Sequence, residues 1–188
     1  MTGHRAVAGL AAALGVLLLG GCALIPGGDR DEPEWAYDEE SARYYRPDLV
    51  SQSTELVEEH FPMLGEVAPV TIADGRFTDP ADRAPIPAPD DSWWQAVIEL
   101  GAEQRDALIA RAEGTAGALT ALEPVTPETI GAILVPTLDG EVEDCAGGWV
   151  EVQPGLVQSA NISEAGDVIE LTAMCVDGTQ LVTSARDM

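Results

Sequence analysis

The pattern of apolar and polar positions predicts two helical stretches and a strand in the first half of the chain. An aromatic and acidic segment, 35–45, suits a helical turn or two, because its acids precede its arginine. Apolar side chains then recur on one face of a helix over 47–61. β-branched residues predict a strand over 67–73, Asp74-Gly75 signals a turn, and 76–78 is a candidate continuation of the strand.

The residues after a stretch with four prolines at 79–91 fit two interpretations. Ser92-Trp-Trp-Gln95 matches a capping box, which would begin a long helix. From Trp94 to Leu100, however, apolar residues recur at every second position, which is the period of a strand. A continuous helix would also place a glycine and an arginine in its apolar stripe. We therefore expect a strand over 93–100 and a helix over 102–113.

Local signals in the second half predict one short helix followed by strands. Thr126-Pro127 fits a helix start, with the threonine as N-cap, and the helix can reach only to about Val135 before Pro136. From Cys145 onward the expected strands are 149–152, 156–162, 168–176 and 179–185.

Asp177-Gly178, between the last two strands, is a strong hairpin signal. A two-residue loop there pairs Val176 with Thr179, Met174 with Leu181 and Thr172 with Thr183. The order of elements predicts an α+β fold: a mainly antiparallel sheet with a C-terminal β-hairpin and two or three packed helices.

The first 22 residues have the character of a secretory signal. A cationic start, Met1 to Arg5, precedes an apolar run that ends at Leu19, and Gly20-Gly21-Cys22 follows. The segment Leu19-Gly20-Gly21-Cys22 resembles the lipobox of bacterial lipoproteins. The resemblance implies that Cys22 receives a diacylglyceryl group, that the chain is cleaved just before Cys22, and that the protein stays on the outer face of the membrane.

An uncleaved membrane anchor or an ordinary secretory signal is the alternative. Residues 6–25 carry no charge, and these 20 residues are long enough to span a bilayer. The strongly apolar part stops directly at Gly-Gly-Cys, which favours the lipoprotein. Lipoprotein and anchor both place the body outside the cytoplasm, since Arg5 precedes the apolar run.

We therefore expect three parts along the chain. These are a signal peptide over 1–21, a lipidated N-terminus with a flexible tether over 22–34, and a single α+β domain over 35–188. Residues 67–112, with a proline-rich loop before an aromatic strand and a helix, also resemble uncharacterised actinobacterial lipoproteins. That resemblance implies no activity.

The charge balance narrows the choice of partners. The chain has 33 acids and 9 basic residues, all of them arginine, for a net charge of −24. Without Arg5, 8 arginines face 33 acids, which gives −25. The electrostatic field of so negative a protein repels polyanions, so nucleic acid is excluded as a partner. The expected partners are the membrane, through the lipid on Cys22, and an unknown protein or small ligand.

Two cysteines remain when Cys22 carries the lipid. Cys145 and Cys175 form an even pair in an oxidising compartment, where a disulfide is the usual outcome. A metal site is the alternative, but neither cysteine belongs to a C-x-x-C motif or has a nearby histidine.

The groups that usually carry catalysis are scarce. His60 is the only histidine after Cys22, and it lies on the apolar face of the expected helix, which favours a packed side chain over a base or metal ligand. No G-x-S-x-G, P-loop or HExxH motif occurs. The carboxylates of Asp90-Asp91 and of Glu141, Glu143 and Asp144 remain as candidate catalytic pairs. Turns and helix caps also account for them, so we expect no enzyme, no catalytic residues and no cofactor.

The acid-rich segments and the tryptophans each fit more than one interpretation. The acid-rich segments 74–82 and 139–144 are where Ca²⁺ would bind, but neither has EF-hand spacing, and we expect no metal site. Trp93, Trp94 and Trp149 either pack in the core or line a groove for a ligand. The sequence thus predicts a lipid-anchored, extracytoplasmic binding or cell-envelope accessory module. The alternative is a carboxylate-dependent enzyme that acts on envelope glycans.

Overall fold

A computed structural model describes residues 34–67, 69–82, 91–114, 123–158 and 167–186. The chain divides into two units, Met1–Glu32 and Pro33–Met188, and all the described residues belong to the second. Within them, none of the helices is both long and apolar enough to cross a membrane.

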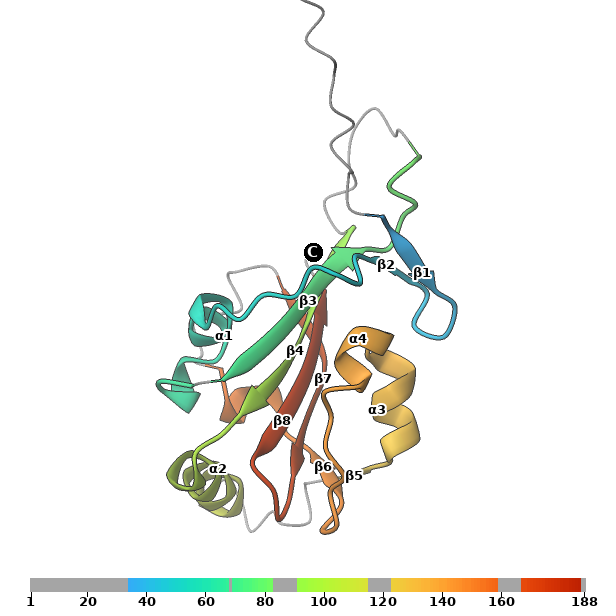
Figure 1. Cartoon of the computed structure of the whole chain (residues 1–188). Coiled ribbons are helices and arrows are strands. Elements are labelled where there is room, and N and C mark those ends of the chain that lie inside the picture. Colours follow the sequence, from blue (N-terminus) through green and yellow to red (C-terminus); the bar gives the residue numbers. More distant parts are fainter. Residues whose placement is uncertain (1–33, 68, 83–90, 115–122, 159–166, 187–188) are drawn as a thin grey trace, which may run out of the picture. The chain divides into compact units, whose positions relative to one another are not determined.

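The described chain forms eight strands, four α-helices and two 3₁₀ turns (Figure 1). The strands are β1 (Ala36–Asp38), β2 (Arg43–Tyr45), β3 (Val70–Arg76), β4 (Ser92–Glu99), β5 (Pro124–Val125), β6 (Trp149–Glu151), β7 (Val168–Cys175) and β8 (Gln180–Arg186). The helices are α1 (Glu55–His60), α2 (Ala102–Gly114), α3 (Pro127–Ile133) and α4 (Pro136–Asp139), with 3₁₀ turns η1 (Pro62–Leu64) and η3 (Pro154–Leu156).

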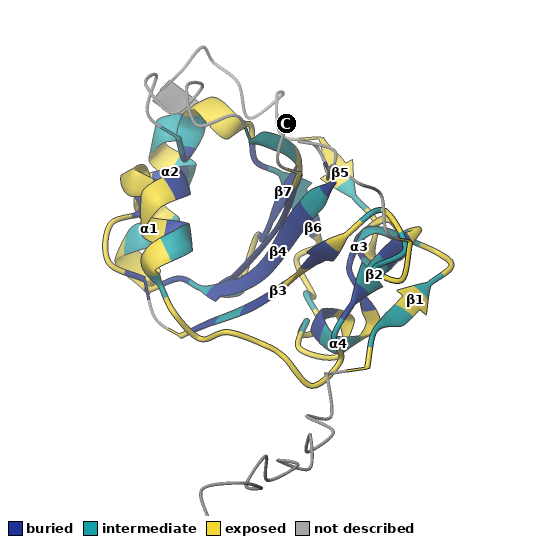
Figure 2. Cartoon of the chain, turned by 90° about the horizontal axis from the view of Figure 1, so that it is seen from above, coloured by how far each residue is buried: buried dark blue, intermediate teal, exposed yellow. Residues whose placement is uncertain are grey.

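The eight described strands form one sheet in the order β1-β2-β3-β4-β8-β7-β6-β5. The neighbouring strands pair antiparallel throughout this order. Figure 2 shows α1 and α2 on one side of the sheet and α3 and α4 on the other. The α+β class, the antiparallel sheet and the C-terminal hairpin all agree with the sequence-based prediction.

Each face of the sheet has its own hydrophobic core. Trp94, Ala96 and Ile98 of β4 point to the core beneath α1 and α2, together with Phe61 and Leu108. On the opposite face, Trp93 and Val97 pack with side chains of α3, of α4 and of the junction between them (Ile130, Leu134, Val135, Leu138). Because β4 is central and covered on both faces, nearly all of its side chains are buried.

Gln95 is the polar exception within β4. Its side chain is fully buried, yet both ends of the amide are satisfied. Nε2 donates to the carbonyl of Ile133 at 2.7 Å, and Oε1 accepts from the Val135 N–H at 2.9 Å. The amide thereby fixes the junction between α3 and α4 on the sheet.

The hairpin of β7 and β8 forms in the predicted register, but β7 ends at Cys175 and β8 begins at Gln180, so the expected pair of Val176 and Thr179 is not part of the ladder. Thr172 pairs with Thr183 and Met174 with Leu181, and the two threonine hydroxyls lie 3.1 Å apart. The register shifts between Ile169 and Leu171, which places Glu170 in a β-bulge.

Arg43 of β2 reaches the bulge across the sheet. Its guanidinium is buried, donates to the carboxylate of Glu170 and to the carbonyl of Ile133, and lies 3.1 Å from Ser184 Oγ. Its Cζ lies 5.4 Å from the centre of the Trp93 ring. Burial lowers the pKa of Arg43, an effect that the charge of Glu170 opposes. This network fastens the β1–β2 hairpin to the sheet.

The choice of a strand and a helix after the proline-rich stretch is confirmed. The strand spans Ser92–Glu99 and the helix Ala102–Gly114, close to the predicted bounds. The helix start at Thr126-Pro127 also forms, and the Thr126 side chain accepts from the Thr129 N–H. This helix ends at Ile133, and Pro136 begins a second short helix instead of ending the region.

The expected helical turns over 35–45 are wrong, because this segment is the β1–β2 hairpin. Asp38 lies at its turn, where the carboxylate accepts from the backbone N–H of Ser41 at 3.0 Å and from the Ser41 hydroxyl. The acid therefore stabilises a turn and not a helix N-terminus. Pairing of β2 with β3 then adds the hairpin to the sheet.

The helix expected over 47–61 is much shorter, Glu55–His60. Before it, Ser51 forms a β-bridge with Ile72, and the two residues exchange hydrogen bonds of 2.8 Å. Leu49 and Val50 are 40 % and 42 % exposed, so the helical spacing at these positions is coincidental. Long-range pairing with β3 outweighs the local helical pattern.

Two smaller expectations in the β regions are corrected. Asp74-Gly75 is not a turn but lies inside β3, which runs from Val70 to Arg76. The candidate strand over 156–162 begins instead in a 3₁₀ turn, Pro154–Leu156, and its end lies outside the described residues.

Candidate functional site

A cavity of about 260 Å³ lies where α3, α4 and the start of β6 meet. Its apolar lining consists of Pro127 and Ile130 of α3, Val142 of the following loop and Trp149 of β6. Asp139, Glu143, Asp144 and Cys145 complete the lining. We call this cavity the acidic pocket.

Three carboxylates of the acidic pocket have no cation beside them. Asp139, Glu143 and Asp144 are exposed, and among the described residues none of their side chains forms an ion pair or a hydrogen bond. No arginine lines the cavity, and the chain contains no lysine. The negative potential of the pocket is therefore uncompensated by its own wall.

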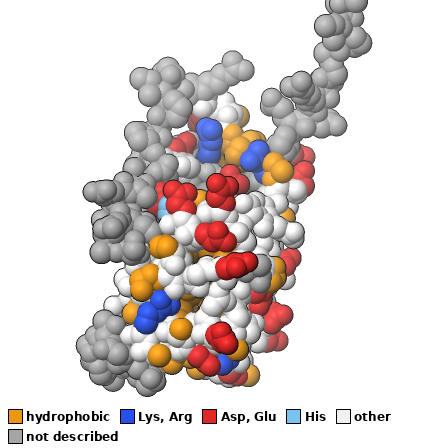
Figure 3. All heavy atoms as spheres, turned by 90° about the vertical axis from the view of Figure 1, so that its left-hand side faces the viewer, with side chains coloured by type: hydrophobic (Ala, Val, Ile, Leu, Met, Phe, Trp, Pro, Cys, Tyr) orange, Lys and Arg blue, Asp and Glu red, His pale blue; other side chains and the backbone are white. Residues whose placement is uncertain are grey.

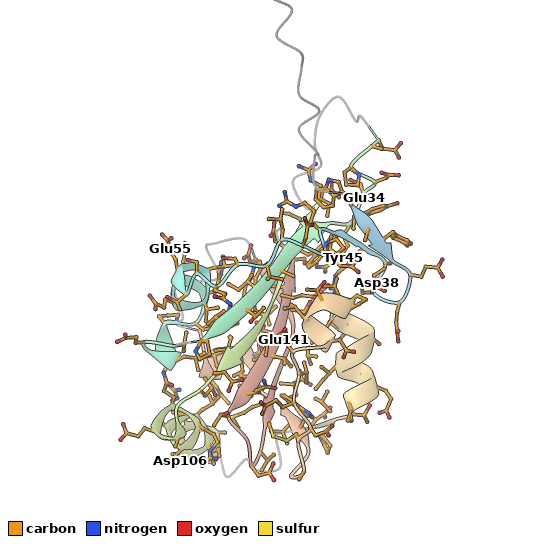
Figure 4. The ribbon with its side chains drawn as sticks, in the orientation of Figure 1. Glu34, Asp38, Tyr45, Glu55, Asp106 and Glu141 are labelled. Carbon is orange, nitrogen blue, oxygen red and sulfur yellow. A yellow bond between two sulfur atoms is a disulfide. The ribbon has the colours of Figure 1, made fainter. Side chains whose placement is uncertain are left out.

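The loop that carries these acids is held by Gln180, at the start of β8. Its Oε1 accepts from the Glu143 N–H at 2.8 Å, and its Nε2 donates to the Glu141 carbonyl at 3.1 Å and to Glu99 Oε1 at 2.7 Å. Glu141 lies two residues after the end of α4 (Figure 4). A buried glutamine after a hairpin turn leaves no local signal in the sequence, so Gln180 was not predicted.

The disulfide expected from the sequence closes the same loop. Cys145 and Cys175 are bonded, with Cα atoms 5.7 Å apart, within the usual range for a disulfide. Trp149 pairs with Cys175 in the register of β6 and β7. The bridge therefore fastens the wall of the acidic pocket to the central hairpin.

Metal binding by the acids of this loop finds little support in the geometry. Among the described residues, only Cys145, Cys175 and Asp177 bring three ligand atoms of His, Cys, Asp or Glu within 4.8 Å of one another. Two of these residues form the disulfide. The acids at 139–144 therefore do not bring three carboxylate oxygens within 4.8 Å of one another.

His60 lies on the opposite face of the sheet, far from these acids in the fold. It is 6 % exposed, its Nε2 lies 3.2 Å from Asp167 Oδ2, and its ring centre lies 5.1 Å from that of Trp94. The indole N–H of Trp94 donates to the same Asp167 oxygen at 3.0 Å. These contacts tie α1 to the start of β7, as a packed histidine does.

The three tryptophans considered as a groove are all core residues. Trp93, Trp94 and Trp149 are only 1 %, 6 % and 4 % exposed. The adjacent pair point to opposite faces, as on any strand, but both faces are covered. Trp149 nevertheless contributes to the wall of the acidic pocket, and among the described residues its indole N–H has no hydrogen-bond partner.

Of the remaining candidate residues, one has a structural role and two lie where the structure is not described. Asp91 is buried and accepts from the Thr78 backbone N–H at 2.8 Å and from the Thr78 hydroxyl, which holds the end of β3. Cys22 and Asp90 lie outside the described residues.

Figure 3 shows the face with α1 and α2, where acidic side chains are scattered and do not form one patch. A second hollow on that side, of about 490 Å³, is lined by Glu58, Pro62, Gly65 and Glu66.

Comparisons with known proteins add no assignment to this geometry. No protein-family model matches the chain, and no match was found among curated proteins or among solved structures.

Proposed function

We propose that the protein is a lipid-anchored, extracytoplasmic, non-enzymatic module that binds a ligand in the acidic pocket. The acidic pocket itself is the observation that carries the binding function, since it combines an apolar wall with unpaired carboxylates. The location rests on the segment Leu19 to Cys22. The disulfide between Cys145 and Cys175 suits an oxidising compartment outside the cytoplasm and so supports that location.

Replacement of Cys22 with alanine is expected to abolish attachment of the lipid and cleavage of the signal. Two acyl chains hold a protein stably in a bilayer, because each buried methylene contributes about 0.8 kcal/mol. The measurement is metabolic labelling with a clickable fatty acid in the bacterial host, with Cys145→Ala as the matched cysteine control. Continued labelling of the Cys22→Ala variant would contradict the proposed anchor.

An enzyme that acts on envelope glycans is the second candidate, and one observation favours it. Asp139, Glu143 and Asp144 line one concave site, and glycoside hydrolysis needs two carboxylates on opposite sides of the scissile bond. Our proposal predicts that the purified full chain releases no reducing ends from isolated cell walls above a boiled control. Release that disappears in Glu143→Gln, with unchanged melting temperature, would establish the enzyme instead.

A further inference from the structure

We infer that the bridge between Cys145 and Cys175 is a thiol–disulfide exchange site, where Cys145 is the sulfur attacked and Asp177 selects cationic thiols over anionic ones. This exchange role goes beyond the proposed binding function and requires neither a ligand in the acidic pocket nor the lipid anchor. Three features of the structure carry it: the position of Asp177, the charge around the bridge and the unequal exposure of the two cysteines.

Asp177 lies against both sulfur atoms of the bridge. Its Oδ1 lies 3.4 Å from Cys145 Sγ and 3.4 Å from Cys175 Sγ. Two glycines make room for this approach. A Cβ atom at Gly147 would lie 2.7 Å from the carboxyl carbon of Asp177, and one at Gly178 would lie 2.7 Å from Cys175 Sγ. A larger residue at either position would therefore displace the carboxylate or the sulfur.

The charge of Asp177 is not neutralised by an ion pair. Among the described residues, Asp177 has no basic partner within salt-bridge distance. Arg105 donates to the neighbouring Gly178 carbonyl at 3.5 Å, but its ion pair is with Asp106. A negative charge so close to the sulfurs opposes the arrival of any further negative charge there. An attacking thiolate and the thiolate that leaves the bridge both bring such charge.

The two cysteines differ in their access to a dissolved thiol. Cys145 is half-exposed and lines the acidic pocket, whereas Cys175 of β7 is only 4 % exposed. A thiol therefore reaches Cys145 first. Asp139, Glu143 and Asp144 line the same cavity, so an anionic thiol is repelled as it approaches and a cationic thiol is attracted.

The exchange proceeds in two steps. The sulfur of a thiolate bonds to Cys145 Sγ while the bond between the two Sγ atoms breaks, and Cys175 leaves as a thiolate. A second thiolate then attacks the added sulfur, which releases a small-molecule disulfide and frees Cys145. The two thiols supply the two electrons that reduce the bridge, and the protons that they lose pass through water to the cysteines. Because the thiolate of Cys175 forms beside Asp177, an ammonium group on the attacking thiol offsets the unfavourable charge.

Three thiols that differ in one end group test this selection by charge. 2-Mercaptoethanesulfonate is anionic, 2-mercaptoethanol is neutral and cysteamine carries an ammonium group. Each reacts with the full chain in detergent, acid stops the reaction, and mass spectrometry follows the loss of the bridge and locates the added thiol. Asp177→Asn removes the charge and keeps a residue that suits a turn before glycine. The ratio of its rate to the wild-type rate cancels the intrinsic reactivity of each thiol.

We expect the added thiol on Cys145. Asp177→Asn should speed the reaction of the sulfonate about tenfold and that of 2-mercaptoethanol about threefold, the effects of one charge at this distance, and should change that of cysteamine little. In the wild type, salt at about 1 M should speed the sulfonate and slow cysteamine, because the Debye length falls to about 3 Å. This second measurement needs no variant.

Asp48→Asn is the charge-matched control. Asp48 is exposed in the segment between β2 and α1, and β2 is separated from β7 in the sheet by β3, β4 and β8. The control should leave all three rates unchanged, because it alters the net charge by the same amount at a site far along the sheet from the bridge.

Four results would overturn the inference. An added thiol mainly on Cys175 would identify the wrong sulfur. Equal acceleration of all three thiols by Asp177→Asn would mean that the variant only loosens the turn. Equal effects of Asp177→Asn and Asp48→Asn would mean that only the net charge matters. A rate that does not depend on the thiol concentration, or no reaction with cysteamine, would show that the bridge is closed to exchange in the folded protein.

Discussion

Replacement of Cys145 and Cys175 with alanine together will lower the free energy of unfolding by about 3.7 kcal/mol, the value that the chain-entropy model assigns to a loop of this length. The two cysteines are 30 residues apart in the sequence, so the bridge removes a large loop-closure entropy from the unfolded chain. Such a loss is a large part of the 5–15 kcal/mol that stabilises a typical domain. Urea unfolding of the oxidised wild type and of the variant measures it.

The single variants provide the control for this experiment. If the cross-link dominates, Cys145→Ala, Cys175→Ala and the double variant all lose nearly the same stability, because each removes the same bridge. If packing dominated instead, the two single variants would lose different amounts of stability, because Cys145 is half-exposed and Cys175 is buried. Additive losses, or a double-variant loss below about 1 kcal/mol, would mean that the bridge contributes little.

Replacement of Gly75 with alanine will destabilise the fold by about 3 kcal/mol, the upper part of the range for overpacked cores. A Cβ atom at this position would lie 2.0 Å from the carbonyl oxygen of Tyr44 and 2.5 Å from Cζ2 of Trp93. Gly75 pairs with both Tyr45 and Trp93, so β2 or the indole must move. The indole also packs against Arg43, so its movement disturbs the network that fastens the β1–β2 hairpin.

Gly155→Ala is the matched control for Gly75→Ala, because a Cβ atom at Gly155 would meet no heavy atom within 4 Å. Both variants add one methyl group to a glycine with negative φ, so the difference between them isolates the steric effect. Urea unfolding monitored by tryptophan fluorescence gives both free energies. Comparable stabilities for the two variants would show that the strands accommodate the methyl group without cost.

Elements with a strong local signal could be predicted from the sequence. The Asp177-Gly178 signal predicted the register of the hairpin correctly, although residues 176–179 all lie between the two strands. The Thr126-Pro127 start is a property of one helical turn. The disulfide partner of Cys175 followed from the number of cysteines and the expected compartment, with no need of coordinates.

Elements that depend on distant partners were decided by the tertiary structure. Residues 35–45 form a hairpin because β2 pairs with the edge of β3. Ser51 is extended because its backbone exchanges hydrogen bonds with the backbone of Ile72. Gly75 resembles a turn glycine in the sequence, whereas in the fold it makes room for the Trp93 indole. Local spacing contains no information about these partners, so it predicted helix and turn where the sheet forms strand.

The candidate site shows the same division. The sequence by itself determined the acids at 139–144, the bridging cysteines and the absence of lysine, because these are facts of composition and order. Only the tertiary structure brought Ile130 and Trp149 to the same cavity. A pocket requires walls from several elements at once, and long-range packing, not local propensity, sets their relative positions.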